Sequence, residues 1–177
     1  MTTDPPPAPT LSSWKPALAV GLPRMDATHR EFVEQLDALA ALAGGPPTAA
    51  GPLLEALIAH TEAHFAQEER WMDALGFEPG GCHHAQHASV LQVLHEVRRR
   101  LHAEGDALDP ELLGRLAPAL AEWLDVHVPM LDAALAQVMA ERGLDPEAAP
   151  DATSTPTTAT ADDRPMIARC ESACPPR

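Results

Sequence analysis

Histidine and carboxylate side chains recur near the middle of this sequence at a spacing that suits metal coordination. His64 and Glu68 stand four residues apart, so on a helix they project from the same face. Leu57, Thr61 and Trp71 continue that stripe, which places the polar pair on the face that packs inward. A buried carboxylate without a partner is costly, so either a cation or compensating charge from neighbouring helices is expected beside Glu68.

Five more side chains of the same types lie on other stretches of the chain: His29, His83, His87, His127 and Asp132. Together the set holds five imidazoles and two carboxylates, more than the four ligands of a tetrahedral zinc site or the six of an octahedral ion. Two ions are therefore the natural number. Glu68 and Asp132 could each bridge the pair, and the histidines would divide three and two. The metal with two histidines would keep an open position for a small molecule.

The residues alone leave the identity of the metal open. Imidazole with carboxylate suits iron, and it also suits zinc, copper and nickel.

Helices must carry these side chains, because apolar residues recur every three to four positions and alanine and leucine dominate. The pattern predicts an all-α fold. One helix covers about residues 24–43, a second begins between 48 and 52 and ends at 75, a third ends at 104, and a fourth covers about 110–142. Asp109 followed by Pro110 is a strong start signal for the fourth. Pro118 and Pro129 predict a kink or local break within it.

Four amphipathic helices with short connections imply an up-down-up-down bundle, which brings all seven candidate ligands to one end. The domain boundaries that we expect are an N-terminal arm at 1–23, the bundle at 24–143 and a disordered tail at 144–177. The arm is rich in proline and holds Trp14, and the tail is rich in proline and threonine.

Charge and composition exclude several classes of partner. The 12 basic and 26 acidic residues of the 177 give a formal net charge of −14, the wrong sign for nucleic acid or an anionic membrane. No run of 18 apolar residues could span a bilayer. The first residues lack an export signal, so a cytoplasmic location is expected. Cys82, Cys170 and Cys174 are too few for a disulfide framework.

The order and spacing of the motifs resemble those of the hemerythrin family, specifically its bacterial members. The motifs are Trp14 with Val20-Gly21, Asp26-Ala-Thr-His29, His64-Phe-Ala-Gln-Glu68-Glu69, His83-x3-His87 and Trp123-Leu-x2-His127-x4-Asp132. The resemblance covers about residues 14–142.

The resemblance implies a non-haem di-iron centre with an oxo or hydroxo bridge that binds dioxygen reversibly. Carried over residue by residue, His83, His87 and His127 bind the coordinatively complete iron. His29 and His64 bind the iron with the vacant position, while Glu68 and Asp132 bridge. Trp123 and Leu124 stand where the family has its gating pair. The pocket residues that we expect around the vacant position are Phe32, Trp123, Leu124 and Val128.

His60 departs from the family, which usually has an aromatic residue there. It could hydrogen-bond to a ligand, supply protons, or simply fill space. Other histidines, His84, His95 and His102, miss the inward stripe and are predicted on the surface, as is Glu69.

The function that we expect is oxygen carriage, storage or sensing, and we assign no catalytic residue to it. Two other functions compete with this expectation. One is a di-iron peroxidase, oxidase or nitric oxide reductase, with His60 as the additional acid or base. The other is a module for signalling or iron homeostasis whose tail contacts a protein partner. A ferritin-like oxidase fits less well, because such sites use Glu-x-x-His pairs and more carboxylates.

Overall fold

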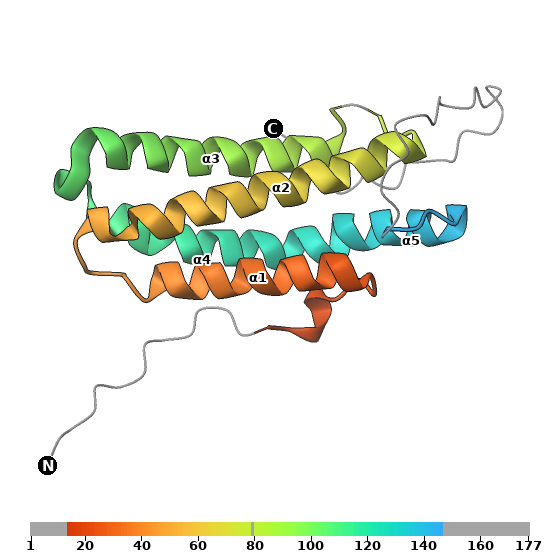
Figure 1. The fold of residues 1–177 in the computed structure, drawn as a ribbon, viewed down its shortest axis with the longest axis horizontal. Helices are drawn as coiled ribbons and strands as arrows, with labels where there is room; N and C mark the ends of the chain where they lie inside the picture. The colour runs from red at the N-terminus through yellow and green to blue at the C-terminus, as the bar shows by residue number, and fades with distance from the viewer. Residues whose placement is uncertain (1–13, 79, 147–177) are drawn as a thin grey trace, which may run out of the picture.

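The computed structural model describes residues 14–78 and 80–146 and shows an antiparallel bundle of long helices (Figure 1). The long elements are α1 (Pro23–Ala40), α2 (Gly51–Leu75), α3 (Cys82–Glu104) and α4 (Pro110–His127), the last continued by a π-helical segment (Val128–Asp132) and α5 (Ala133–Arg142). Short 3-10 turns cover Pro16–Leu18, Pro47–Ala50 and Gly105–Ala107. The predicted all-α bundle is confirmed.

Two parts of the sequence-based predictions lie outside this description. They are the first thirteen residues of the arm and residues 147–177 of the tail, including Cys170 and Cys174. Within the described residues, no helix is both long enough and apolar enough to cross a membrane.

The helix ends follow the local signals in the sequence. The Asp109 side chain accepts a hydrogen bond of 3.0 Å from the backbone N–H of Glu111, as expected of an N-cap before Pro110. Gly76 ends α2 in the left-handed conformation, with φ of 75°. The predicted end of the first helix at residue 43 is wrong, because α1 stops at Ala40 and a turn carries the chain onward.

The π-helical segment is the local break that the prolines predicted. Pro129 has no backbone N–H for the carbonyl one turn earlier, so the regular ladder is interrupted there. The N–H of Ala133 instead bonds to the carbonyl of Val128, five residues back, which is the π pattern. The other candidate, Pro118, lies inside α4, which continues past it.

The packed core has two parts with the candidate ligands between them. A large cluster runs through the bundle and ends near Phe32, Phe65 and Val128. A small cluster consists of Met25, Trp71, Met72, Leu135 and Met139. Along α1, along α2 and along the continuous helix from α4 to α5, the predicted ligands lie between members of these two clusters. Apolar side chains therefore cover the polar layer from both directions along the bundle axis.

The last residues of the N-terminal arm pack on the bundle beside the layer of candidate ligands. The Arg30 guanidinium lies 4.3 Å from the centre of the Trp14 ring, and Lys15 pairs with Asp125 on α4. Leu18, in the first 3-10 turn, is buried in the large cluster. The predicted N-terminal arm thus includes a helical turn that packs on the bundle.

Candidate metal centre

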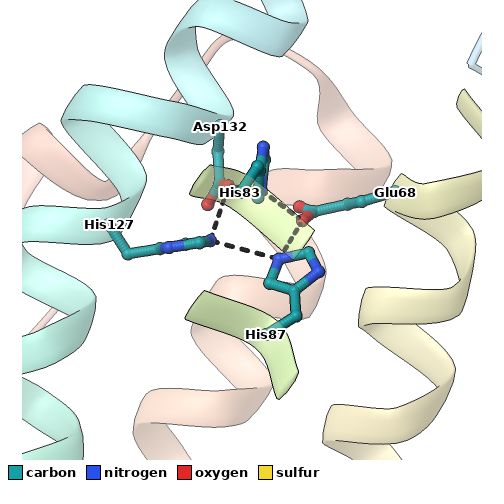
Figure 2. A group of neighbouring side chains, drawn as sticks. All are labelled: Glu68, His83, His87, His127 and Asp132. Carbon is teal, nitrogen blue, oxygen red and sulfur yellow. Dashed lines mark hydrogen bonds and ion pairs between the residues drawn. The ribbon is translucent and has the colours of Figure 1, made fainter. Parts of the chain in front are cut away.

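All seven predicted ligand side chains meet in one buried layer near one end of the bundle. His64 is the most exposed of them at 7%, and the other six are 4% exposed or less. They come from α1, α2, α3, the end of α4 and the π-helical segment, and Figure 2 shows five of them pointing toward one another. Side chains separated by up to about a hundred positions in the sequence are thereby placed in contact.

The donor atoms fall into two groups that share both carboxylates. One group holds Glu68, His83, His87, His127 and Asp132, and the other holds His29, His64, Glu68 and Asp132. Within each group, one donor atom from every residue lies within 4.8 Å of all the others. The membership of the two groups is the same as that of the two ligand sets implied by the hemerythrin resemblance.

Each carboxylate directs one oxygen toward each group of histidines. Glu68 Oε1 lies 3.4 Å from His64 Nε2, whereas Oε2 lies 3.1 Å from His87 Nε2. Asp132 Oδ2 lies 3.3 Å from His29 Nε2, whereas Oδ1 lies 3.1 Å from His127 Nε2. A carboxylate placed in this way can bind two ions, one through each oxygen.

His83 and the facing histidine nitrogens complete the larger group. His83 Nε2 lies 3.2 Å from Glu68 Oε2 and 3.1 Å from Asp132 Oδ1, and His87 Nε2 lies 3.3 Å from His127 Nε2. Donor atoms bound at about 2.1 Å to one ion, with bond angles of about 90° to 110°, stand roughly 3.0 to 3.4 Å apart. The observed separations match that spacing.

Unsatisfied polar atoms at the centre also fit a bound cation. His29 Nε2, Glu68 Oε1 and both oxygens of Asp132 are buried and have no hydrogen-bond partner among the described residues. A buried polar atom left in this state costs about 1 to 3 kcal/mol. Bound cations would satisfy these lone pairs and balance the two carboxylate charges.

The ionisation of the metal-free cluster follows from the same contacts. Burial raises the pKa of Glu68, but the facing imidazoles, His64 first among them, outweigh burial and lower that pKa to about 2. Burial disfavours the charged form of His83, but the adjacent carboxylates of Asp132 and Glu68 outweigh burial and raise its pKa to about 9. Burial lowers the pKa of His64 to about 4. Burial also raises the pKa of Asp132, but the facing imidazoles outweigh burial and lower that pKa, so both carboxylates are held in the ionised form that binds metal.

This ionisation predicts an unusual dependence of stability on pH for the metal-free chain. Between pH 6.5 and 9, folded His83 keeps a proton that the unfolded chain has lost, so the free energy of unfolding falls as the pH rises. The fall should be on the order of 2 kcal/mol in denaturant titrations. The metal-loaded chain should lack it, because a metal-bound imidazole is neutral. A metal-free chain whose stability is constant or rising over this range would contradict the prediction.

Oxygen atoms behind the histidines fix the orientation of two rings and lie near a third. His127 Nδ1 lies 2.9 Å from Gln86 Oε1, and His29 Nδ1 lies 3.1 Å from the Leu18 carbonyl oxygen. When Nδ1–H donates to these oxygens, Nε2 keeps its lone pair for the centre. His87 Nδ1 lies 3.5 Å from Glu69 Oε1, a contact longer than a hydrogen bond.

The sequence-based reasoning missed all three of these oxygen atoms. Gln86 directly precedes His87, and that position beside a candidate ligand was the only signal available for it. A backbone carbonyl such as that of Leu18 gives no signal in residue type. Glu69, predicted on the surface, has a side chain 41% exposed, yet its carboxylate reaches His87.

Removing the Gln86 amide tests the orienting role. We expect Gln86→Leu to weaken metal affinity by about 10- to 100-fold, because His127 loses the acceptor that fixes its tautomer. Competition against a chromophoric chelator measures the change. Gln92→Leu, at an exposed position of the same helix, is the matched control and should leave affinity unchanged. Equal affinities for the two variants would show that the Gln86 contact is incidental.

The predicted pocket residues surround this layer on the side of the large apolar cluster. Phe32, Leu124 and Val128 are each 3% exposed or less, and Trp123 is partly buried. The Trp123 ring stacks on His127 with ring centres 4.2 Å apart. The layer therefore has an apolar wall, in which Trp123 extends from His127 toward the surface.

His60 makes its contacts with α1 instead of with the predicted ligands. Its Nε2 lies 3.1 Å from the Thr28 carbonyl oxygen, and its Nδ1 lies 3.6 Å from Glu31 Oε2. Among the described residues, no hydrogen bond joins it to any of the seven. Two of the three histidines predicted on the surface make exposed contacts with acids of α2, His95 with Glu62 and His102 with Glu55.

Comparison with known proteins agrees with this geometry. The family model described as the hemerythrin HHE cation binding domain matches residues 20–137. The chain is 41% identical over 132 residues to a bacteriohemerythrin from Ralstonia nicotianae, an alignment that covers 75% of this chain and 91% of that protein. It is 31% identical over 121 residues to a bacteriohemerythrin from Pseudomonas paraeruginosa, covering 68% and 76% respectively. No solved structure gives a significant match. The extent of the family match and of these identities shows that the chain belongs to the hemerythrin family.

Proposed function

We propose that the chain holds two iron ions in this layer and binds dioxygen reversibly there. His83, His87 and His127 would hold one ion, His29 and His64 would hold the other, and Glu68 and Asp132 would serve both, together with an oxo or hydroxo group from solvent. The observation that carries the proposal is the division of donor atoms into two groups that share both carboxylates. Family membership favours iron over the other metals that this donor set would accept.

The ligand count of the two groups explains why a small molecule could bind at one ion only. The group with His83 offers three imidazoles and two carboxylate oxygens, whereas the group with His64 offers two imidazoles and two carboxylate oxygens. A pair of ferrous ions, when bound, supplies the two electrons that reversible dioxygen binding requires. The residues that would hold the ion in the group with His64 would leave one position open to dioxygen.

We expect the apolar side chains on one side of the layer to keep water and acids away from that position. Phe32, Leu124 and Val128 present buried hydrocarbon beside the layer, and none of them can donate a proton. Exclusion of water and proton donors favours the release of intact dioxygen over irreversible oxidation of the centre.

One experiment tests the proposal directly. Metal analysis of the full chain from iron-replete cells should give two iron ions per chain. The reduced protein should gain near-ultraviolet and visible charge-transfer bands in air and lose them under vacuum over repeated cycles. One ion or none, or a single permanent change to a ferric spectrum, would contradict reversible binding.

The surroundings of His60 favour a second candidate, a di-iron redox enzyme. His60 and His64 line the same surface pocket, so His60 could carry protons between solvent and the edge of the centre. Steady-state consumption of peroxide or nitric oxide that disappears in His60→Phe would favour the enzyme. Unchanged gas binding in that variant, with negligible turnover in both proteins, would favour the carrier.

A cytoplasmic location, the boundaries at 23 and 143, and a protein partner for the tail belong to the same proposal. Deletion of residues 147–177 is the test for the tail. A sensing or signalling role requires a cellular response that this deletion removes while gas binding stays unchanged.

A further inference from the structure

A surface pocket of about 290 Å³ opens between α1 and α2 beside the metal centre. Its lining includes Arg24 and Thr28 from α1 and Gln67 and Arg70 from α2. His64, the most exposed of the seven predicted ligands, forms part of the wall. The pocket therefore touches the centre through one residue, and apart from His60 its other side chains have no role in the proposed function.

The charged groups of this pocket are mostly cationic, although the chain as a whole carries a net charge of −14. Arg24 and Arg70 both line it, and in the described part of the chain neither guanidinium forms an ion pair. Glu31 is the acidic residue of the lining, and its carboxylate lies 3.6 Å from His60 Nδ1. Two uncompensated guanidinium groups at one opening create a local positive potential.

Hydrogen-bond donors also outnumber free acceptors in the lining. Gln67 Oε1 already accepts a 2.7 Å hydrogen bond from Arg70, which leaves the Gln67 amide NH₂ to donate. The indole N–H of Trp71 is buried and has no hydrogen-bond partner among the described residues. Thr28 Oγ1 donates to the Arg24 carbonyl oxygen, so its hydroxyl proton is already used. A ligand that only accepts hydrogen bonds would suit this set of groups.

We propose that this pocket is a binding site for a small oxyanion, held between the guanidinium groups of Arg24 and Arg70. Guanidinium groups bind planar or tetrahedral oxyanions through paired, charge-assisted hydrogen bonds. The volume accommodates an anion of the size of phosphate or a short carboxylate together with water. The anion would lie beside His64, on the outer side of the centre, and its binding does not depend on which gas or metal the centre holds.

Calorimetric titration of the metal-loaded full chain with inorganic phosphate at low ionic strength tests the site. We expect one saturable site whose affinity falls at least tenfold in the double variant Arg24→Gln/Arg70→Gln. Arg99→Gln/Arg100→Gln is the matched control, because it removes the same charge from exposed arginines that pair with Glu96 and Glu104 on α3. The absence of saturable binding, or an equal loss in both double variants, would overturn the proposal.

A parallel titration with succinate distinguishes an inorganic oxyanion from an organic carboxylate as the ligand of this pocket. Tighter binding of phosphate identifies an inorganic anion, and tighter binding of succinate identifies a carboxylate. In either case each anion should displace the other, and independent binding of the two would overturn a single site.

Chemical labelling gives a readout that needs no variant. Phosphate should slow the modification of Arg24 and Arg70 by phenylglyoxal, measured by peptide mass spectrometry, while Arg99 and Arg142 react at unchanged rates. If phosphate slowed the modification of none of these four arginines, or slowed all four equally, the proposal would also be overturned.

Discussion

Replacing Glu68 with glutamine should lower the bound metal from two ions per chain to one or none. Glu68 is fully buried and directs one oxygen toward His64 and the other toward His83 and His87. Glutamine keeps the shape of the side chain but removes its charge and replaces one of the two oxygens with an NH₂ group that cannot bind a cation. Metal analysis of the purified variant measures the effect.

The control for this prediction lies on the same helix. Glu62→Gln changes the charge by the same amount at a half-exposed position whose partner is His95, away from the centre. It should retain two ions per chain. Circular dichroism of both variants separates loss of metal from loss of fold. A Glu68→Gln protein that holds two ions with unchanged affinity would exclude Glu68 as a bridge.

Removing the metal should lower the melting temperature of the chain by roughly 8 to 16 °C. Metal at about 1,000 times its dissociation constant stabilises the folded state by about 4 kcal/mol, and each kcal/mol shifts the melting temperature of a chain of this size by about 2 to 4 °C. The structural reason is that the bare cluster buries two carboxylates and several unsatisfied polar atoms. Calorimetric scans of the loaded and chelator-treated chain measure the shift.

Glu68→Gln again supplies the comparison. If metal is the cause, the chelator should shift the melting temperature of this variant less than that of the unaltered chain, because the variant holds fewer ions. An equal shift in the two proteins would mean that the chelator acts elsewhere, and equal melting temperatures for the loaded and stripped chain would show that the helices pack without help from the centre.

Helices and their order could be predicted from the sequence because the responsible signals are local. Asp109 before Pro110 caps α4, Gly76 ends α2, and apolar residues at helical spacing mark the buried faces. Up-down-up-down topology then follows from the short connections, and it brings the seven ligand candidates to one end. Their types and positions are printed in the sequence, so the candidate site could be proposed before its geometry was available.

The surroundings of the site could not be predicted in the same way, because they depend on contacts between distant helices. Gln86 and His127 are 41 positions apart, and their hydrogen bond requires a particular rotation of α3 against α4. His60 shares a helix with the candidate ligands His64 and Glu68, yet its hydrogen bond goes to Thr28 on α1. Spacing along one helix cannot show which neighbour a polar side chain meets.

The π-helical segment limits which insertions and deletions the continuous helix from α4 to α5 can tolerate. In a regular α-helix, residues five apart point in different directions, and the wide turn brings His127 and Asp132 close enough for a 3.1 Å contact. The same turn sets the rotation of α5, whose buried residues are Leu135, Ala136 and Met139, while Val138 is only half-buried. Insertion or deletion of a single residue there would separate the two donors and turn the α5 core face toward solvent together. The register of the final ten-residue helix is thus tied to the chemistry of the centre.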